Sequence, residues 1–156
     1  SSEGVRLLPE GILVVSRITR DDLYLRMAGL LALRATCHRR GVGCVLVDED
    51  GYVLATGYNG VASGMPHCSE GFKCEAASAP SGTNLDGCEA IHAEQNAIMR
   101  VADIRRVHTC YVTVSPCMTC TKLLLGTGCK RIKFQDEYPH AAAARELWTR
   151  AGRAWG

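Results

Sequence analysis

No apolar run in the sequence approaches the roughly 20 residues that a membrane-spanning helix requires, so we expect no membrane insertion. The opening residues SSEGVRLLPEG lack the charged-then-apolar pattern of a secretory leader, which favours a cytoplasmic protein. The formal net charge of +2 is too small to indicate a nucleic acid or a membrane surface as partner. Repeats and low-complexity tracts are also absent. A single globular domain over residues 1–156 remains, in which residues 1–15 can form a loosely ordered N-terminal extension.

Cysteine, by contrast, is abundant: the chain has nine. An odd number of cysteines and the missing leader favour a reducing compartment, where clustered cysteines are more often metal ligands than disulfides. Three of them stand in apolar contexts and should pack as small hydrophobic side chains: Cys44, Cys110 and Cys129. The candidate ligands are the other six: Cys37, Cys68, Cys74, Cys88, Cys117 and Cys120.

Hydrophobic periodicity and turn residues predict alternating helices and strands. The expected helices are 19–39, 91–101, 115–127 and 141–151. The expected strands are 42–47, 52–56, 109–114 and 130–134, with an irregular segment over 57–87. In the first helix, the residues at helical spacing that should face inward are Leu23, Met27, Leu30, Leu31 and Arg34. Ser115 and Pro116 should start the third helix, and Gly128 should end it. An early hairpin followed by alternating strands and helices predicts an α/β fold, a three-layer α/β/α sandwich with a mixed central sheet.

Four residues near the starts of two expected helices form a candidate metal site. Cys117 and Cys120 are three positions apart in a first helical turn, so both sulfurs face one side. The positive end of that helix favours the thiolates that a metal binds. With His92 as third ligand the set suits zinc and leaves a fourth position for water. Glu94, two residues further on, can take the proton of that water.

Each half of this pattern has a simpler explanation on its own. A CxxC pair alone is equally typical of a redox pair or of half a structural zinc site. An HxE triplet alone is usually a coincidence on a surface. A redox protein would use Cys117 and Cys120 but would leave His92 and Glu94 without a role. A zinc-stabilised binding module without catalysis would need no carboxylate beside an open metal position. The two halves together, in the order H-x-E…P-C-x-x-C, favour the catalytic site of a zinc nucleobase deaminase.

The run from Val42 to Phe134 resembles the cytidine deaminase superfamily, and within it the deoxycytidylate (dCMP) deaminase family, which includes phage and bacterial members. The pieces that carry the resemblance are VGCVLVDEDG, GYNG (57–60), HAEQNAI (92–98) and YVTVSPCMTC (111–120). The resemblance implies hydrolytic deamination of dCMP to dUMP, which would supply thymidylate synthesis, in the host cytoplasm if a phage encodes the chain. It also implies zinc on His92, Cys117 and Cys120, with Glu94 shuttling protons to ring N3 and to the departing ammonia.

Two further residues are substrate-binding candidates by the same resemblance. Asn59 of GYNG matches an asparagine that touches the sugar or the base, although Asn-Gly is also a common turn pair. Ser115 stands where the related tRNA adenosine deaminases usually have glutamate, and Asn96-Ala97-Ile98 stands where they have Met-Ala-Leu. Nucleoside cytidine deaminases lack GYNG in this form. The tRNA adenosine deaminases and the nucleoside cytidine deaminases remain alternatives of lower weight. The small net charge offers little electrostatic attraction for a tRNA.

A second, structural zinc is expected on Cys37, Cys68, Cys74 and Cys88. Four thiolates close a tetrahedral site, and some phage and bacterial relatives carry such an extra zinc. A loop of about thirty residues with few large apolar side chains also needs a tie of this kind. His38 and His67 are substitutes if one cysteine does not reach. Unligated loop cysteines, or a Cys68–Cys74 disulfide in an oxidised sample, are the alternatives.

A nucleotide substrate also needs a phosphate site, and the sequence has no Walker lysine or other phosphate loop. The candidates for phosphate or effector binding are the glycine turn (Gly57, Tyr58 and Gly60) and three arginines (Arg34, Arg39 and Arg40). Basic residues are common in a last helical turn, so a solvated helix end explains the arginines equally well. The resemblance implies a homohexamer that is activated by dCTP with Mg²⁺ and inhibited by dTTP.

Overall fold

The computed structural model describes residues 5–7, 13–36, 40–67, 80 and 88–156 and has a five-stranded sheet at its centre. The order of the strands is β4-β3-β5-β6-β7. β3 is antiparallel to both β4 and β5, whereas β5, β6 and β7 are parallel, so the sheet is mixed. The strands are β3 (Gly43–Val47), β4 (Val53–Tyr58), β5 (Thr109–Val114), β6 (Arg131–Asp136) and β7 (Ala154–Trp155).

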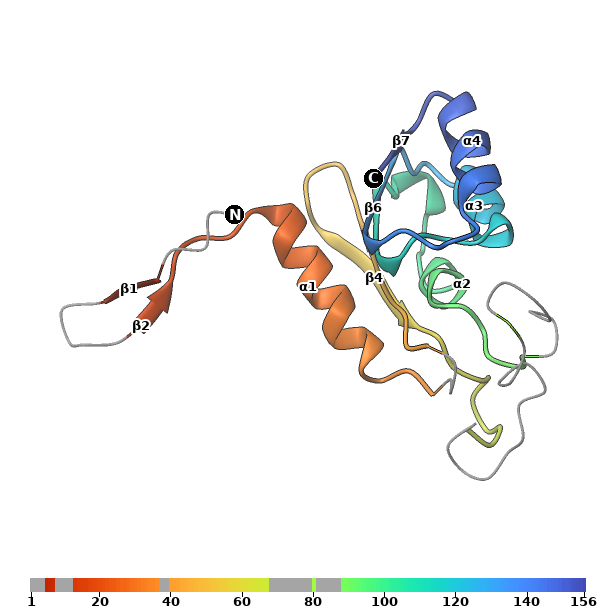
Figure 1. Ribbon diagram of the computed structural model, residues 1–156, viewed down its shortest axis with the longest axis horizontal. Helices are drawn as coiled ribbons and strands as arrows, with labels where there is room; N and C mark the ends of the chain where they lie inside the picture. The colour runs from red at the N-terminus through yellow and green to blue at the C-terminus, as the bar shows by residue number, and fades with distance from the viewer. Residues whose placement is uncertain (1–4, 8–12, 37–39, 68–79, 81–87) are drawn as a thin grey trace.

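Helices cover both faces of this sheet, as Figure 1 shows. α1 (Arg20–Ala32) packs against β3 and β5 on one face. α2 (Ala93–Ile98), α3 (Met118–Leu125) and α4 (Ala142–Arg150) lie on the other, and a 3-10 turn, η3 (Ile104–Arg106), precedes β5. The predicted three-layer α/β/α sandwich is confirmed. No helix in the described parts of the chain has the length and apolar character needed to cross a membrane.

Each of the two central strands buries side chains on both faces, because a helical layer covers each side. Alternate residues of β3 and β5 face α1, where Val45, Val47 and Tyr111 pack around Ala28 of the helix. The intervening residues of the two strands face α2, α3 and α4, and there they form the larger part of the core. Cys44, Cys110 and Cys129 belong to that larger part and are fully buried, as predicted for cysteines that only pack.

The prediction for α1 was wrong in its length and in part of its inward face. The helix begins after its N-cap residue Thr19 but ends at Ala32 rather than at 39. Leu23 and Leu30, which were expected to point inward, are 41% and 68% exposed. The helix instead turns a small residue to the sheet: a Cβ atom on Gly43 would lie only 1.9 Å from the carbonyl oxygen of Ala28. The close approach of these two backbones therefore outweighs leucine periodicity in setting the rotation of the helix.

Boundaries near the candidate site also differ from the prediction. α2 spans six residues rather than eleven. α3 starts after Cys117, not at Ser115, because the backbone N–H of Ser115 donates to Asp136 O and keeps that residue in the strand layer. Gly126, not Gly128, is the C-cap residue of α3. The N–H of Gly128 donates to Ile104 O, and a Cβ atom there would lie 2.1 Å from the carbonyl oxygen of Arg105, so this glycine permits a close backbone contact.

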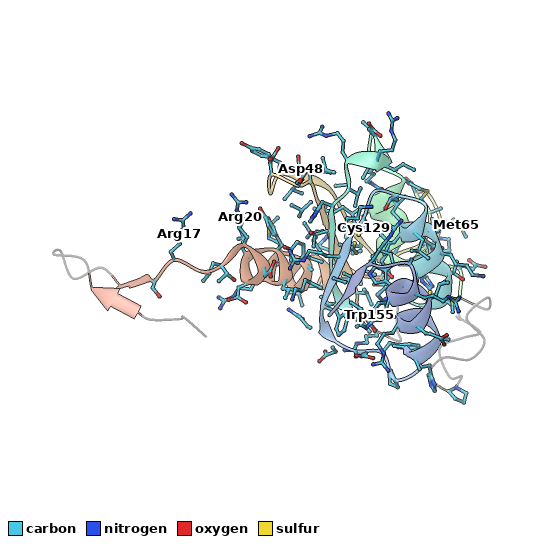
Figure 2. All side chains as sticks on the ribbon, turned by 90° about the horizontal axis from the view of Figure 1, so that it is seen from above. Arg17, Arg20, Asp48, Met65, Cys129 and Trp155 are labelled. Carbon is cyan, nitrogen blue, oxygen red and sulfur yellow. The ribbon has the colours of Figure 1, made fainter. Side chains whose placement is uncertain are left out.

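The chain also forms three short strands that the sequence did not suggest. β7 extends the sheet beside β6. β1 (Val5–Leu7) and β2 (Leu13–Val15) pair as an antiparallel hairpin within the segment that was expected to be a loose extension. Figures 1 and 2 show this hairpin standing away from the sandwich, joined to α1 by the segment that carries Arg17. The active-site candidates lie at the opposite side of the domain from it, around α2 and α3.

Candidate active site

The segment that carries His92 and Glu94 is fastened to the end of β4. Gly60 and Ile91 form an antiparallel bridge in which each N–H donates to the other's carbonyl, at 3.1 and 2.8 Å. His92 follows at once as the N-cap residue of α2. Its backbone N–H donates to Oε1 of Gln95 at 2.9 Å. This cap fixes where the helix begins and so places Glu94 in its first turn.

The other ligand segment is the start of α3. Cys117 is the N-cap residue and Cys120 lies three residues later, fully buried. The backbone N–H and the hydroxyl of Thr121 both donate to Cys117 O, at 2.9 and 2.8 Å. α2 packs against α3, so the first turns of the two helices meet.

Three predicted ligands come together at this meeting point. The Nδ1 atom of His92 lies 3.3 Å from Sγ of Cys120 and 3.6 Å from Sγ of Cys117. Within the described ranges, these are the one group of three or more His, Cys, Asp or Glu side chains whose ligand atoms all lie within 4.8 Å of one another. Tetrahedral zinc with ordinary Zn–N and Zn–S bonds holds a nitrogen and a sulfur about 3.5 Å apart. The donor set and its spacing therefore fit zinc.

The ionisation of these side chains also suits a cation. The hydrogen bond from the Cys120 thiol lowers the pKa of Cys117 to about 4, with help from His92 and against the effect of burial. The hydrogen bond to Cys117 raises the pKa of His92, although burial opposes this change. Donation to Cys117 and burial raise the pKa of Cys120. Without a metal, one thiolate is thus already favoured, and a bound cation would favour the second.

Glu94 is the acid–base candidate, and its surroundings match that role. The residue is only 4% exposed. Burial raises the pKa of its carboxyl group above the usual range, while its own backbone N–H and the charge of His92 act in the opposite direction. A buried carboxyl beside a metal position can hold a proton near neutral pH and release it, which proton transfer requires.

The predicted glycine turn, residues 57–60, lies close to this site, and its polar groups form hydrogen bonds with other parts of the chain. Asn59 is buried, with Oδ1 accepting from Val42 N–H at 2.7 Å and Nδ2 donating to Arg40 O at 2.8 Å. The N–H of Gly60 belongs to the bridge described above, and the N–H of Asn59 donates to Val42 O. At Gly57, a Cβ atom would lie 2.4 Å from the carbonyl oxygen of Ala93 in α2. The turn therefore joins β4, the start of β3 and the His92 segment.

Of the remaining described candidates, Ser115 is buried, whereas Arg40 and Arg34 are exposed. Oγ of Ser115, two residues before Cys117, accepts from the N–H of Tyr138 at 2.7 Å. Arg40 forms an exposed ion pair with Asp136 at 2.9 Å. Asp136 also accepts the backbone N–H of Ser115, and Tyr138 donates to the Ser115 side chain. The ion pair therefore places Arg40 next to the segment 136–138 that Ser115 bonds. Arg34 is exposed on the turn after α1.

Most of the predicted second zinc site falls outside the described residues. Cys37, Cys68 and Cys74 lie there, and so do the substitute ligand His38 and the phosphate candidate Arg39. Cys88 is half-buried a few residues before the His92 segment, and His67 is exposed. The four-cysteine site stays a prediction.

Two residues of the site were missed from the sequence. Gln95 caps the backbone of His92, and the Nδ2 atom of Asn96 donates to Tyr58 O at 2.9 Å. The glutamine had a recognisable signal, because a glutamine three residues after the N-cap position is the capping-box pattern. The asparagine had none, since its partner is 38 positions away in the chain.

Comparison with known proteins places these features in a family. The family model described as the cytidine and deoxycytidylate deaminase zinc-binding region matches residues 18–136. Deoxycytidylate deaminase of Mycobacterium phage D29 is 33% identical over 128 residues, which cover 79% of this chain and 99% of the phage protein. Deoxycytidylate deaminase of Schizosaccharomyces pombe is 36% identical over 136 residues, or 85% of this chain and 42% of the yeast protein. The chain thus spans about two fifths of the length of this protein and of deoxycytidylate deaminase from Saccharomyces cerevisiae.

The fold comparison agrees. The crystal structure of dCMP deaminase from the cyanophage S-TIM5 in complex with dCMP and dUMP superposes with a TM-score of 0.69 and 25% identity. The match covers 97% of this chain and 98% of the cyanophage chain.

Proposed function

Because this chain belongs to the cytidine and deoxycytidylate deaminase family, we propose that it is a zinc-dependent enzyme that hydrolyses dCMP to dUMP and ammonia. The observation that carries the proposal is the convergence of His92, Cys117 and Cys120 beside the buried carboxyl group of Glu94. The match to the phage D29 deaminase, over 79% of this chain and 99% of the phage protein, supports dCMP as the substrate class. The product would feed thymidylate synthesis.

The residues divide the chemistry between them. His92, Cys117 and Cys120 would hold the zinc, which when bound lowers the pKa of a water molecule in its open position. Glu94 takes a proton from that water as oxygen is added to C4 of the cytosine ring. The same carboxyl group would deliver that proton to ring N3, then take the remaining proton of the oxygen added at C4 and pass it to the amino group, which leaves as ammonia. Its burial keeps these protons from exchanging with bulk solvent before they are delivered.

Substrate placement is part of the proposal. Ser115 and Asn59 are the proposed substrate-binding residues, since Ser115 stands two residues before Cys117 and Asn59 stands next to the Gly60–Ile91 bridge. The N–H groups of Asn59 and Gly60 already donate to backbone carbonyl groups within the chain. We therefore propose that arginine side chains bind the phosphate, in place of the backbone N–H groups of Gly57, Tyr58 and Gly60. Arg40 is the best described candidate, with Arg34 and Arg39 nearby in the chain.

Assembly and control follow the same family expectation. We propose a homohexamer with dCTP–Mg²⁺ as activator and dTTP as inhibitor, acting in the cytoplasm or in a host's cytoplasm. The support for an oligomer is a set of large apolar side chains exposed on or just after α1: Leu23, Leu30 and Leu33. An effector would have to bind one state of that oligomer more tightly than another.

The test is a substrate panel on zinc-loaded protein, read by ammonia release and by loss of cytosine absorbance. We expect turnover of dCMP, with kcat/KM well above that for deoxycytidine, and sigmoidal kinetics that dCTP makes hyperbolic. Equal turnover of dCMP and deoxycytidine would reject the monophosphate assignment. Adenosine deamination in a tRNA anticodon stem without turnover of dCMP would favour the tRNA enzyme, and no turnover at all would favour a binding module.

A further inference from the structure

We propose that Asn96 is a positioning residue, whose side-chain amide holds the zinc-ligand and proton-transfer segment in register with the end of β4. This inference rests on the proposed deaminase function, because it concerns the same site. Its geometric basis is independent of any substrate.

The amide of Asn96 joins two chain segments at one point. Its Nδ2 atom donates to Tyr58 O at 2.9 Å and more weakly to Ile91 O at 3.4 Å. Tyr58 is the last residue of β4, and Ile91 immediately precedes His92. The same two segments meet in the Gly60–Ile91 bridge. One side chain thus reinforces the only described pairing between the glycine turn and the ligand segment.

The need for such a tie follows from the size of α2. A helix of six residues is too short to be stable by its own hydrogen bonds, so tertiary contacts must hold it. Gln95 fixes the first turn from inside the helix, through the backbone of His92. Asn96 fixes it from outside, and its own backbone N–H donates to His92 O at 2.9 Å. Glu94 lies between His92 and Asn96 in this turn. Its carboxyl group must reach the water with little tolerance in distance.

The chemistry of asparagine suits the position. Two carbonyl oxygens face the side chain, so a donor is required, and the neutral NH₂ group supplies two N–H bonds. Aspartate of the same shape would bring a carboxylate against two carbonyl oxygens. Leucine of similar size would leave the carbonyl group of Tyr58 without this partner.

The experiment compares Asn96→Asp and Asn96→Leu with Arg100→Ala as matched control. Arg100 donates to the backbone carbonyl oxygen of Asn96 at 2.7 Å and to its Oδ1 atom at 3.5 Å, and among the described residues no side-chain hydrogen bond joins it to β4 or to the His92 segment. For each protein we would measure zinc affinity by chelator competition, kcat and KM for dCMP, and hydrogen exchange of the Gly60 and Ile91 amides in the metal-free state. Partners of this kind around metal ligands typically change affinity or activity about 10–100-fold.

We expect both Asn96 variants to bind zinc about 10-fold more weakly, to lose about 10-fold in kcat with little change in KM, and to exchange the two bridge amides faster. The control should stay within about twofold on all three measurements. Folded Asn96 variants with wild-type zinc affinity and wild-type exchange at Gly60 and Ile91 would overturn the inference. If the variants do not fold, exchange at these two amides in the wild-type protein decides, because protection no greater than that of exposed turn amides would also overturn it. Wild-type protein that binds zinc but never deaminates dCMP would reject the proposed function and leave the positioning result standing.

Discussion

The Nδ1 atom of His92 and the Sγ atom of Cys120 lie 3.3 Å apart, although the two residues are 28 positions apart in the chain. The contact exists because α2 and α3 bring their first turns together on one face of the sheet. Each helix is anchored at its start by local bonds, the Gln95–His92 cap in α2 and the Thr121–Cys117 bonds in α3. The site is therefore a meeting of two helix N-termini, and its positive end potential suits thiolate ligands.

Glu94→Gln should abolish most of the proposed turnover while zinc and fold remain. An amide of the same shape cannot carry a proton between water and the leaving amine, and such transfers contribute about 10²–10⁴-fold in rate. The measurement is kcat for dCMP at a zinc content matched to the wild type. Glu89→Gln, which changes an exposed carboxylate five residues earlier, serves as control and should keep wild-type activity. Substantial turnover by zinc-loaded Glu94→Gln would contradict the assigned role.

His92→Ala, Cys117→Ala and Cys120→Ala should each lower the zinc content by one ion per chain. Three protein ligands hold a catalytic zinc, and two are rarely enough. The metal can be counted by mass spectrometry in protein purified without chelator. Cys129→Ala is the matched control, since that thiol is fully buried in the core and its Sγ atom donates to Arg131 O rather than meeting the ligand cluster. Loss of zinc from the Cys129 variant together with retention in the Cys117 variant would reject the assignment.

Wild-type protein should contain two zinc ions per chain if Cys37, Cys68, Cys74 and Cys88 form the expected structural site. Cys68→Ser and Cys74→Ser should then reduce the count to one and lower the melting temperature, because a structural zinc stabilises the folded state directly. Zinc at the catalytic site should remain in both variants. A wild-type count of one would remove the second site without affecting the first.

Stability should fall in acid through Asp21, which links α1 to the sheet. Burial opposes ionisation there, but hydrogen bonds from the Tyr111 hydroxyl, at 2.5 Å, and from Arg131, at 3.1 Å, hold the pKa of Asp21 below its usual value. A carboxylate with a lowered folded-state pKa stabilises the fold above its unfolded-state pKa of about 3.9. That contribution disappears as the pH falls through the lower folded-state value.

Melting temperatures from pH 7 to pH 2 test this link. Asp21→Asn should melt below the wild type at pH 6, and the difference should shrink as the pH falls below about 4. Asp22→Asn is the control, because that neighbouring carboxylate bonds neither Tyr111 nor Arg131. A difference between Asp21→Asn and wild type that stays constant down to pH 2 would show that the carboxylate charge contributes nothing.

The sequence predicted the layers, and the meeting of His92 with Cys117 and Cys120, more reliably than it predicted helix ends and faces. Strand 109–114 was predicted to the residue, because a short continuous run with β-branched and aromatic residues is typical of a strand that is buried on both faces of a sheet. The exposed face of α1 was not foreseen, since Leu23 and Leu30 follow helical spacing as well as the residues that are buried. Rotation of that helix depends on Gly43, which lies in another element.

What the sequence determined by itself was the chemistry of the site. Two thiols one helical turn apart after a proline, and a carboxyl group two residues after a histidine, together predict a zinc position with a candidate proton carrier before any coordinates are known, because ligand type and local spacing are properties of the chain. Only the tertiary structure decided how the two halves meet and which groups hold them. Asn96 bonds to Tyr58, and Asn59 to residues 40 and 42, through pairings between distant segments that no local pattern encodes. The burial of Glu94, which raises the pKa of its carboxyl group, likewise exists only once the sheet and the helices have closed around it.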